Sequence, residues 1–168
     1  MIASAITGGD VKIINCLPKQ VETLTSKLRQ AGVTVEEAET SLRVISGGPL
    51  NGVNIKTQPH PGFATDLQAQ FMALMTLAQG QSIILETIFE NRFMHVAELN
   101  RMGANITVQG HTAFVSGVKR LSGAPLMATD LRASASLVLA ALAAEGESVI
   151  SRVYHIDRGY FSMEEKLY

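Results

Sequence analysis

Charged side chains stand at matching points of an internal repeat. The segment ATDLQA at residues 64–69 returns as ATDLRA at residues 128–133. Each copy continues with an apolar helix-like run, a glycine, a strand-like run and a second charged segment, over about thirty positions in all. The repeat therefore predicts copies of one supersecondary unit with chemistry at equivalent places. The aspartates are Asp66 and Asp130, and the arginines are Arg92, Arg158 and, in the second copy alone, Arg132.

The three arginines predict a binding site for an anion. Arg92 follows Asn91, Arg158 follows Asp157, and Arg132 lies just after the second aspartate, so each is expected in the first turn of a helix. A cation there opposes the helix dipole at a cost of about 0.3–1 kcal/mol, and local rules are usually broken at functional sites. Forked guanidinium donors beside free helix N–H groups suit a phosphate or carboxylate. The alternative interpretation is that the arginines are scattered over the surface.

The two aspartates allow a structural and a functional interpretation. In the first copy Thr65 is a candidate N-cap and Gln68 stands three residues later, which is a capping-box pattern. On this interpretation Asp66 and Asp130 only complement the positive end of a helix. On the other, they contact the ligand of the arginine cluster. The residues themselves leave both open.

Other polar residues carry less weight. His60 lies between two prolines close to Asp66 and is expected to line the site, whereas the other three histidines are expected to be structural or solvent-facing. Their spacing is not that of a metal site, so no metal and no cofactor is expected. The single cysteine, Cys16, is expected to be a small core residue. A phosphate loop of the Walker type is absent from the sequence.

The elements that position these residues predict an inside-out α/β domain. Nearly every residue of 67–78 and 131–144 is apolar or small, which is typical of a helix buried on all sides. Sheets with alternating strands must then lie outside the helices. Strands are predicted at 10–15, 33–37, 41–45, 53–57, 82–87, 106–109, 112–116 and 149–153, and helices at 19–30, 65–79, 91–102 and 129–144.

Composition and repeats indicate one domain. The 168 residues are 46% hydrophobic and 17% charged, and the net charge of −1 disfavours general nucleic-acid binding. No apolar run is long enough to cross a membrane, so a cytoplasmic protein is expected. A matching Leu-x-x-x-Gly pattern at Leu28 and Leu99 marks three βαβαββ-like units. Because the outer units are incomplete, residues 1–168 are expected to be a single partial domain, truncated at both ends.

Five motifs resemble the bacterial UDP-N-acetylglucosamine enolpyruvyl transferases. The resemblance covers essentially the whole chain, and it implies a domain with buried helices and outer sheets that closes with a second domain over the substrates. It also implies transfer of an enolpyruvyl group from phosphoenolpyruvate to the 3-hydroxyl of UDP-N-acetylglucosamine, in peptidoglycan synthesis. The motifs are TDLQAQF at 65–71, ENRFMHV at 90–96, LNRMGA at 99–104, ATDLRASA at 128–135 and YHIDRGY at 154–160.

The resemblance also implies roles for individual residues. Asp66 matches an aspartate that contacts the 3-hydroxyl and is a candidate base, and Ile88 matches the segment that lines the nucleotide-sugar site. Arg92, Arg132 and Arg158 match arginines that bind or surround phosphoenolpyruvate, with Asp130 beside them. The family's mobile loop with its reactive cysteine, and a phosphoenolpyruvate-binding lysine, belong to the other domain. The chain is therefore expected to be inactive alone, and Cys16 does not take over that role.

The sequence is also compatible with two other functions. One is a non-catalytic module that holds a phosphorylated ligand in its arginine cluster. The other is a fragment of the related shikimate-pathway enolpyruvyl transferase or a relative of the RNA-terminal cyclases. The string NRFMH at 91–95 argues against both the shikimate-pathway enzyme and the cyclase relative.

Overall fold

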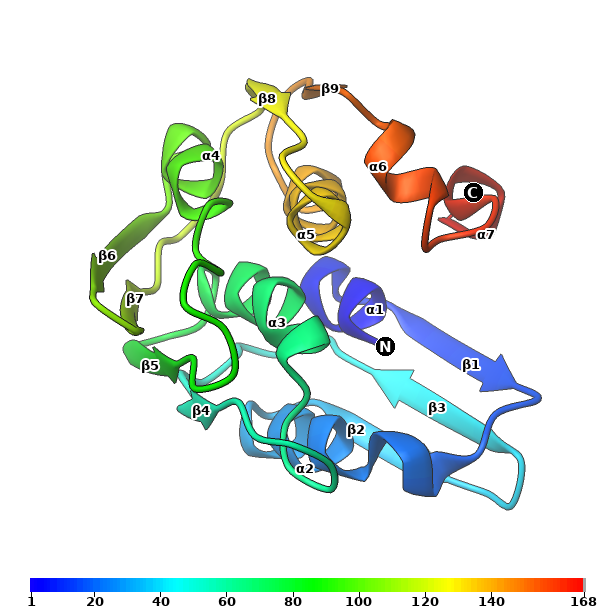
Figure 1. The fold of residues 1–168 in the computed structure, drawn as a ribbon. Coiled ribbons are helices and arrows are strands. Elements are labelled where there is room, and N and C mark those ends of the chain that lie inside the picture. Colours follow the sequence, from blue (N-terminus) through cyan, green and yellow to red (C-terminus); the bar gives the residue numbers. More distant parts are fainter. Residues whose placement is uncertain (168) are drawn as a thin grey trace.

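Three helices lie together at the centre of the structure, a computed structural model that describes residues 1–167. They are α1 (Ile2–Thr7), α3 (Gln68–Met75) and α5 (Leu131–Leu142), and all three contact one another (Figure 1). Every residue of α3 is buried, and α5 buries most of its length. The inside-out α/β architecture predicted from the all-round apolar helices is therefore confirmed.

Three sheets surround these helices. The first is antiparallel with strand order β1-β3-β2, and the second has order β4-β5-β7-β6, in which β4 runs parallel to β5 while β5, β7 and β6 are antiparallel. The third is a parallel pair, β8-β9. The strands are β1 (Asp10–Ile14), β2 (Thr34–Glu37), β3 (Ser41–Ile45), β4 (Ile55–Lys56), β5 (Gln81–Leu85), β6 (Asn105–Gln109), β7 (Thr112–Ser116), β8 (Pro125–Met127) and β9 (Val149–Ser151).

Three of the longer strands alternate between buried and more exposed side chains, as strands of one-sided sheets do. In β3 and β5 the second and fourth residues are buried, and β7 follows the same pattern. The buried faces cover the central helices. Shorter helices complete the fold: η1 (Pro18–Val21), α2 (Glu22–Gln30), η2 (Thr65–Leu67), α4 (Val96–Arg101), α6 (Tyr154–Asp157) and α7 (Met163–Leu167).

The repeat seen in the sequence is a structural repeat. Helices α2 and α4 end alike, each at a glycine with positive φ, 94° at Gly32 and 90° at Gly103. The next amide then bonds back to the leucine of the Leu-x-x-x-Gly pattern, at 3.0 Å for Leu28 and 3.1 Å for Leu99. Such left-handed caps favour glycine, because it carries no Cβ. The parallel pairs β4-β5 and β8-β9 also correspond, since each encloses one of the two repeated helices.

Several predicted boundaries were wrong. The helix predicted at 91–102 is reduced to α4, because residues 91–95 form a loop and turn in which the Val96 amide bonds to the Phe93 carbonyl at 3.0 Å. The helix predicted at 65–79 begins as the short η2 and continues as α3. In α5, Leu142 is 46% exposed, so the expectation of complete burial holds for α3 and for most of α5. Strand β8 was not predicted, and the helix expected to begin at residues 157–158 does not begin there, because α6 ends at Asp157 and α7 begins at Met163.

In the part of the chain that the structure describes, no helix combines the length and the apolar character that crossing a membrane requires.

The central position of α3 generates a stability prediction. Phe71 is fully buried in α3, so we expect Phe71→Ala to lower the free energy of unfolding by about 3–5 kcal/mol, through lost transfer energy and the remaining cavity. Phe161 is the matched control: it is 82% exposed, and Phe161→Ala should change stability by less than about 0.5 kcal/mol. Urea unfolding followed by circular dichroism measures both, and similar losses for the two variants would contradict the inside-out core.

Candidate functional site

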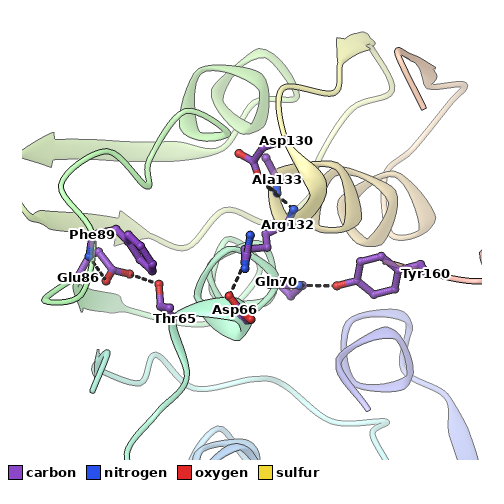
Figure 2. Close-up of polar contacts among 9 residues, drawn as sticks. All are labelled: Thr65, Asp66, Gln70, Glu86, Phe89, Asp130, Arg132, Ala133 and Tyr160. Carbon is purple, nitrogen blue, oxygen red and sulfur yellow. Dashed lines mark hydrogen bonds and ion pairs between the residues drawn. The ribbon is translucent and has the colours of Figure 1, made fainter. Parts of the chain in front are cut away.

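An ion pair joins the starts of the two repeated segments. Asp66 lies in η2, just ahead of α3, and Arg132 lies in the first turn of α5. The Arg132 Nε group donates to the Asp66 carboxylate (Figure 2). Hydrogen bonding with Asp66 raises the pKa of Arg132 above its ordinary value. The Asp66 side chain is 61% exposed and the Arg132 side chain is 32% exposed, so a ligand can reach both charges.

Asp130 has a different function from Asp66, although the repeat places them at equivalent positions. It is the N-cap of α5, and its carboxylate accepts hydrogen bonds from the amides of Arg132 at 2.8 Å and Ala133 at 3.1 Å. These amides are donors that an uncapped helix would leave unpaired. The structural interpretation of the aspartates is therefore right for Asp130, whereas Asp66 points its carboxylate at an arginine.

The predicted capping box of the first copy was wrong. The side chain of Thr65 caps no helix; its hydroxyl donates to the carboxylate of Glu86 at 2.8 Å (Figure 2). Gln68 is fully buried in α3 and does not reach back to the chain ahead of the helix. A long-range partner replaces the local one, which a sequence pattern cannot show.

The argument that all three arginines oppose a helix dipole holds only for Arg132. Arg92 lies in the loop ahead of α4, and its guanidinium carbon is 4.0 Å from the centre of the Phe89 ring, a cation–π contact. Arg158 is the C-cap residue of α6, where the dipole favours a cation. The two wrong placements follow from the helix boundaries, since residues 91–95 form no helix and α6 ends where a helix was expected to begin.

A cavity of about 330 Å³ lies beside the exposed aspartate. Asp66 and Ile88 both line it, and Thr65, His60 and Lys19 line it as well. Ile88 is 38% exposed, so it presents apolar surface there. The structure thus brings together Asp66, Ile88 and, as expected, His60.

Arg132 joins this group through its ion pair with Asp66, whereas in the described part of the chain Arg92 and Arg158 do not. Among residues 1–167, no hydrogen bond or ion pair connects Arg92 or Arg158 with Asp66 or Arg132. The segment after α6 is nevertheless held against α3, because the Gln70 Nε2 group donates to the Tyr160 hydroxyl at 2.8 Å (Figure 2). The repeat predicts that Asp66, Arg92, Arg132 and Arg158 share one open face, and this stays a prediction.

Two polar residues of this region, Glu86 and Tyr160, were not predicted from the sequence to take part in it. Glu86 is 1% exposed directly after β5 and bonds to Thr65, and Tyr160 bonds to the buried Gln70. The alternation of β5 places Glu86 on the same side as the buried Ser82 and Ile84, and this period of two was the one signal in the sequence for its burial. Tyr160 stands within the YHIDRGY motif, which was the only signal for it.

His95 is buried immediately ahead of α4, not inside a helix as predicted. It is 1% exposed, and burial lowers its pKa to about 4, although the Asp130 carboxylate acts in the opposite direction. The imidazole is therefore neutral near pH 7. Its Nε2 atom has no hydrogen-bond partner among the described residues.

Known proteins match this chain along its whole length. A family described as EPSP synthase (3-phosphoshikimate 1-carboxyvinyltransferase) matches residues 1–167. The UDP-N-acetylglucosamine 1-carboxyvinyltransferase of Magnetococcus marinus is 61% identical over 168 residues, covering 99% of this chain and 40% of the relative. The protein of the same name from Thermodesulfovibrio yellowstonii is 58% identical over 160 residues, covering 95% and 38%. The chain thus spans about 40% of the length of the curated relatives it matches.

Solved structures share the fold. The enolpyruvyl transferase NikO from Streptomyces tendae superposes with a TM-score of 0.86 at 27% identity, covering 99% of this chain and 41% of that one. EPSP synthase from Acinetobacter baumannii gives a TM-score of 0.67 at 16% identity, covering 89% and 37%. At that identity the second likeness concerns the fold alone.

The buried imidazole generates a prediction about pH. Between about pH 6.5 and pH 4 the unfolded chain binds a proton at His95 that the folded chain does not bind, so the free energy of unfolding falls as the pH falls through this window. The full loss approaches about 3 kcal/mol, at about 1.36 kcal/mol per pKa unit. Urea unfolding at several pH values measures it. His95→Gln should remove this component and His111→Gln, in the exposed hairpin turn, should retain it; equal pH slopes in the two variants would contradict the prediction.

The two equivalent aspartates should differ in their effect on stability. Asp130→Ala removes a helix cap and should lower the free energy of unfolding by about 0.5–2 kcal/mol. Asp66→Ala removes only an exposed ion pair, for which about 0–1 kcal/mol is expected. Thermal unfolding of the two variants at pH 7 measures the difference. A greater loss for Asp66 than for Asp130 would show that Asp66 is held for stability.

Proposed function

Because the chain belongs to the EPSP synthase family, we propose that it forms part of an enzyme that transfers the enolpyruvyl group of phosphoenolpyruvate to the 3-hydroxyl of UDP-N-acetylglucosamine. The nucleotide sugar is favoured over a shikimate substrate by the named relatives at about 60% identity. The single observation that carries the proposal is the exposed pair of Asp66 and Arg132 beside a cavity of about 330 Å³.

The pair supplies the two kinds of group that this transfer needs. A hydroxyl can attack only if its proton is removed, and the Asp66 carboxylate is an exposed acceptor for that proton. Phosphoenolpyruvate is an anion with carboxylate and phosphate groups, for which a guanidinium is a suitable partner. Arg132 would then exchange Asp66 for the substrate anion when both substrates are bound.

The other site residues take roles around this pair. Ile88 would give the nucleotide sugar an apolar wall, since it lines the same cavity as Asp66. Arg92 and Arg158 would add positive charge around phosphoenolpyruvate. Asp130 would hold the first turn of α5 and, through it, the backbone from which Arg132 extends.

We also propose that residues 1–168 contribute one wall of a two-domain site and do not catalyse the transfer alone. Two observations support this proposal. The chain spans about 40% of the length of its curated relatives, and the side chains of Asp66 and Arg132 are exposed to solvent. A reaction that excludes water needs a closed site. Phosphate release from phosphoenolpyruvate by the isolated chain, at ordinary rates of about 1–10³ per second, would contradict this proposal.

The test uses the enzyme that contains these residues. Asp66→Asn should lower kcat about 10²–10⁴-fold with little change in the KM for UDP-N-acetylglucosamine, as expected for a general base. Arg132→Gln should lower kcat and raise the KM for phosphoenolpyruvate together. Arg120→Gln is the matched control, because Arg120 is an exposed arginine that pairs with Glu145 away from the cavity. Release of phosphate, dependent on the nucleotide sugar, measures all three; near-normal kcat in Asp66→Asn would overturn the assignment.

A further inference from the structure

Glu86 is a buried carboxylate with an unusual number of donors. It follows β5, is 1% exposed, and takes part in no ion pair within residues 1–167. A carboxylate taken out of water is strongly destabilising unless hydrogen bonds replace its hydration. Four groups provide them: the hydroxyls of Thr57 and Thr65, each at 2.8 Å, and the amides of Ile88 at 2.8 Å and Phe89 at 3.2 Å.

These donors come from three separate segments of the site. Thr57 follows β4, Thr65 directly precedes Asp66, and the two amides belong to the loop that carries Ile88. The Phe89 ring in turn lies under the Arg92 guanidinium. Figure 2 shows the Glu86 carboxylate between Thr65 and Phe89. One side chain therefore ties the turn that presents Asp66 to the loop from which Ile88 lines the cavity.

The second copy of the repeat shows what Glu86 makes possible. There the equivalent position is Arg152, which is exposed, and Asp130 caps its own helix. In the first copy the Gln68 amide bonds to the Thr65 carbonyl within η2, the Thr65 hydroxyl bonds to Glu86, and within residues 1–167 no helix amide bonds to the carboxylate of Asp66. It is left to pair with Arg132 across the two copies. The same local sequence thus gives a structural aspartate in one copy and an available one in the other.

We propose that Glu86 is a positioning residue that fixes the Asp66 carboxylate relative to Ile88 and the cavity wall. This inference rests on the proposed function, since it concerns the same site. Glu86 does not touch the substrates: it acts through Thr65 on one side and through the amides of the loop on the other. Its charge strengthens these hydrogen bonds, because bonds to an ionised acceptor are roughly twice as strong as neutral ones.

The experiment separates positioning from stability by changing Thr65 and Glu86 independently. Thr65→Val keeps the shape of the side chain and removes only the hydroxyl that joins it to Glu86, and Thr65→Ser restores a hydroxyl. Glu86→Gln keeps the shape and removes the charge. Glu98→Gln is the matched control: Glu98 is also buried, at 8% exposure, and accepts from the Met127 amide at 2.9 Å away from the cavity.

The first readout is a ¹H–¹⁵N spectrum of the folded chain, in which the Arg132 Nε–H resonance reports the pair with Asp66. Thr65→Val and Glu86→Gln should shift this resonance toward that of a free arginine, and Glu86→Gln should also move the amides of Ile88 and Phe89. Thr65→Ser should restore the original resonance, and Glu98→Gln should leave it in place. An unshifted Arg132 resonance in Thr65→Val would overturn the proposal, because Asp66 would then be held without Glu86.

The second readout is titration with UDP-N-acetylglucosamine. Binding to the unmodified chain should weaken about 3–10-fold in Thr65→Val, the range expected when one hydrogen bond worth about 0.5–1.5 kcal/mol is lost, and should recover in Thr65→Ser. If Thr65→Val binds as tightly as the unmodified chain, Glu86 is only structural. If the unmodified chain does not bind, the proposed function fails for the isolated chain, and the spectra still decide whether Glu86 positions Asp66.

Discussion

The burial of apolar helices at the centre is the constraint on which the rest of this structure depends. Helix α3 has no polar face, so it can be stable in water only when other elements cover it on all sides. Sheets do this with one apolar face each, and their outer faces carry the polar residues. Because α3 and α5 pack against each other at the centre, their starts come together, and Asp66 ahead of α3 pairs with Arg132 in the first turn of α5.

The two copies of the repeat differ in the partners of their equivalent aspartates. Both copies begin with the string ATDL, yet Asp130 binds the amides of its own helix while Asp66 binds an arginine of the other copy. In the first copy the Gln68 amide bonds to the Thr65 carbonyl within η2 and the Thr65 hydroxyl bonds to Glu86, so Asp66 is left without a helix amide as partner among the described residues. A repeat supplies two equivalent positions, and long-range contacts give their side chains different partners.

The charges of the site are distributed by burial. Glu86 is buried, and four donors stabilise its charge, so it is fixed in place. Asp66 and Arg132 remain exposed, where an ion pair contributes little to stability and can be exchanged for a ligand at small cost. His95, buried nearby, remains neutral because burial lowers its pKa to about 4. The rigid charge is therefore internal and the exchangeable charges face the solvent.

The sequence by itself determined the architecture and the candidate residues. Runs that are apolar on all sides indicated buried helices, and the Leu-x-x-x-Gly pattern marked equivalent helix ends. The repeat singled out Asp66 and Arg132. All three signals come from the order of residues along the chain and need no knowledge of long-range contacts. The tertiary structure alone decided how the charges are used. Thr65 was expected to cap a helix, but its hydroxyl bonds to a distant residue instead. Arg92 and Arg158 were expected in first helical turns, but the helices begin and end at other residues. The burial of Glu86 depends on partners up to 29 residues away, and such contacts exist only once the chain has folded.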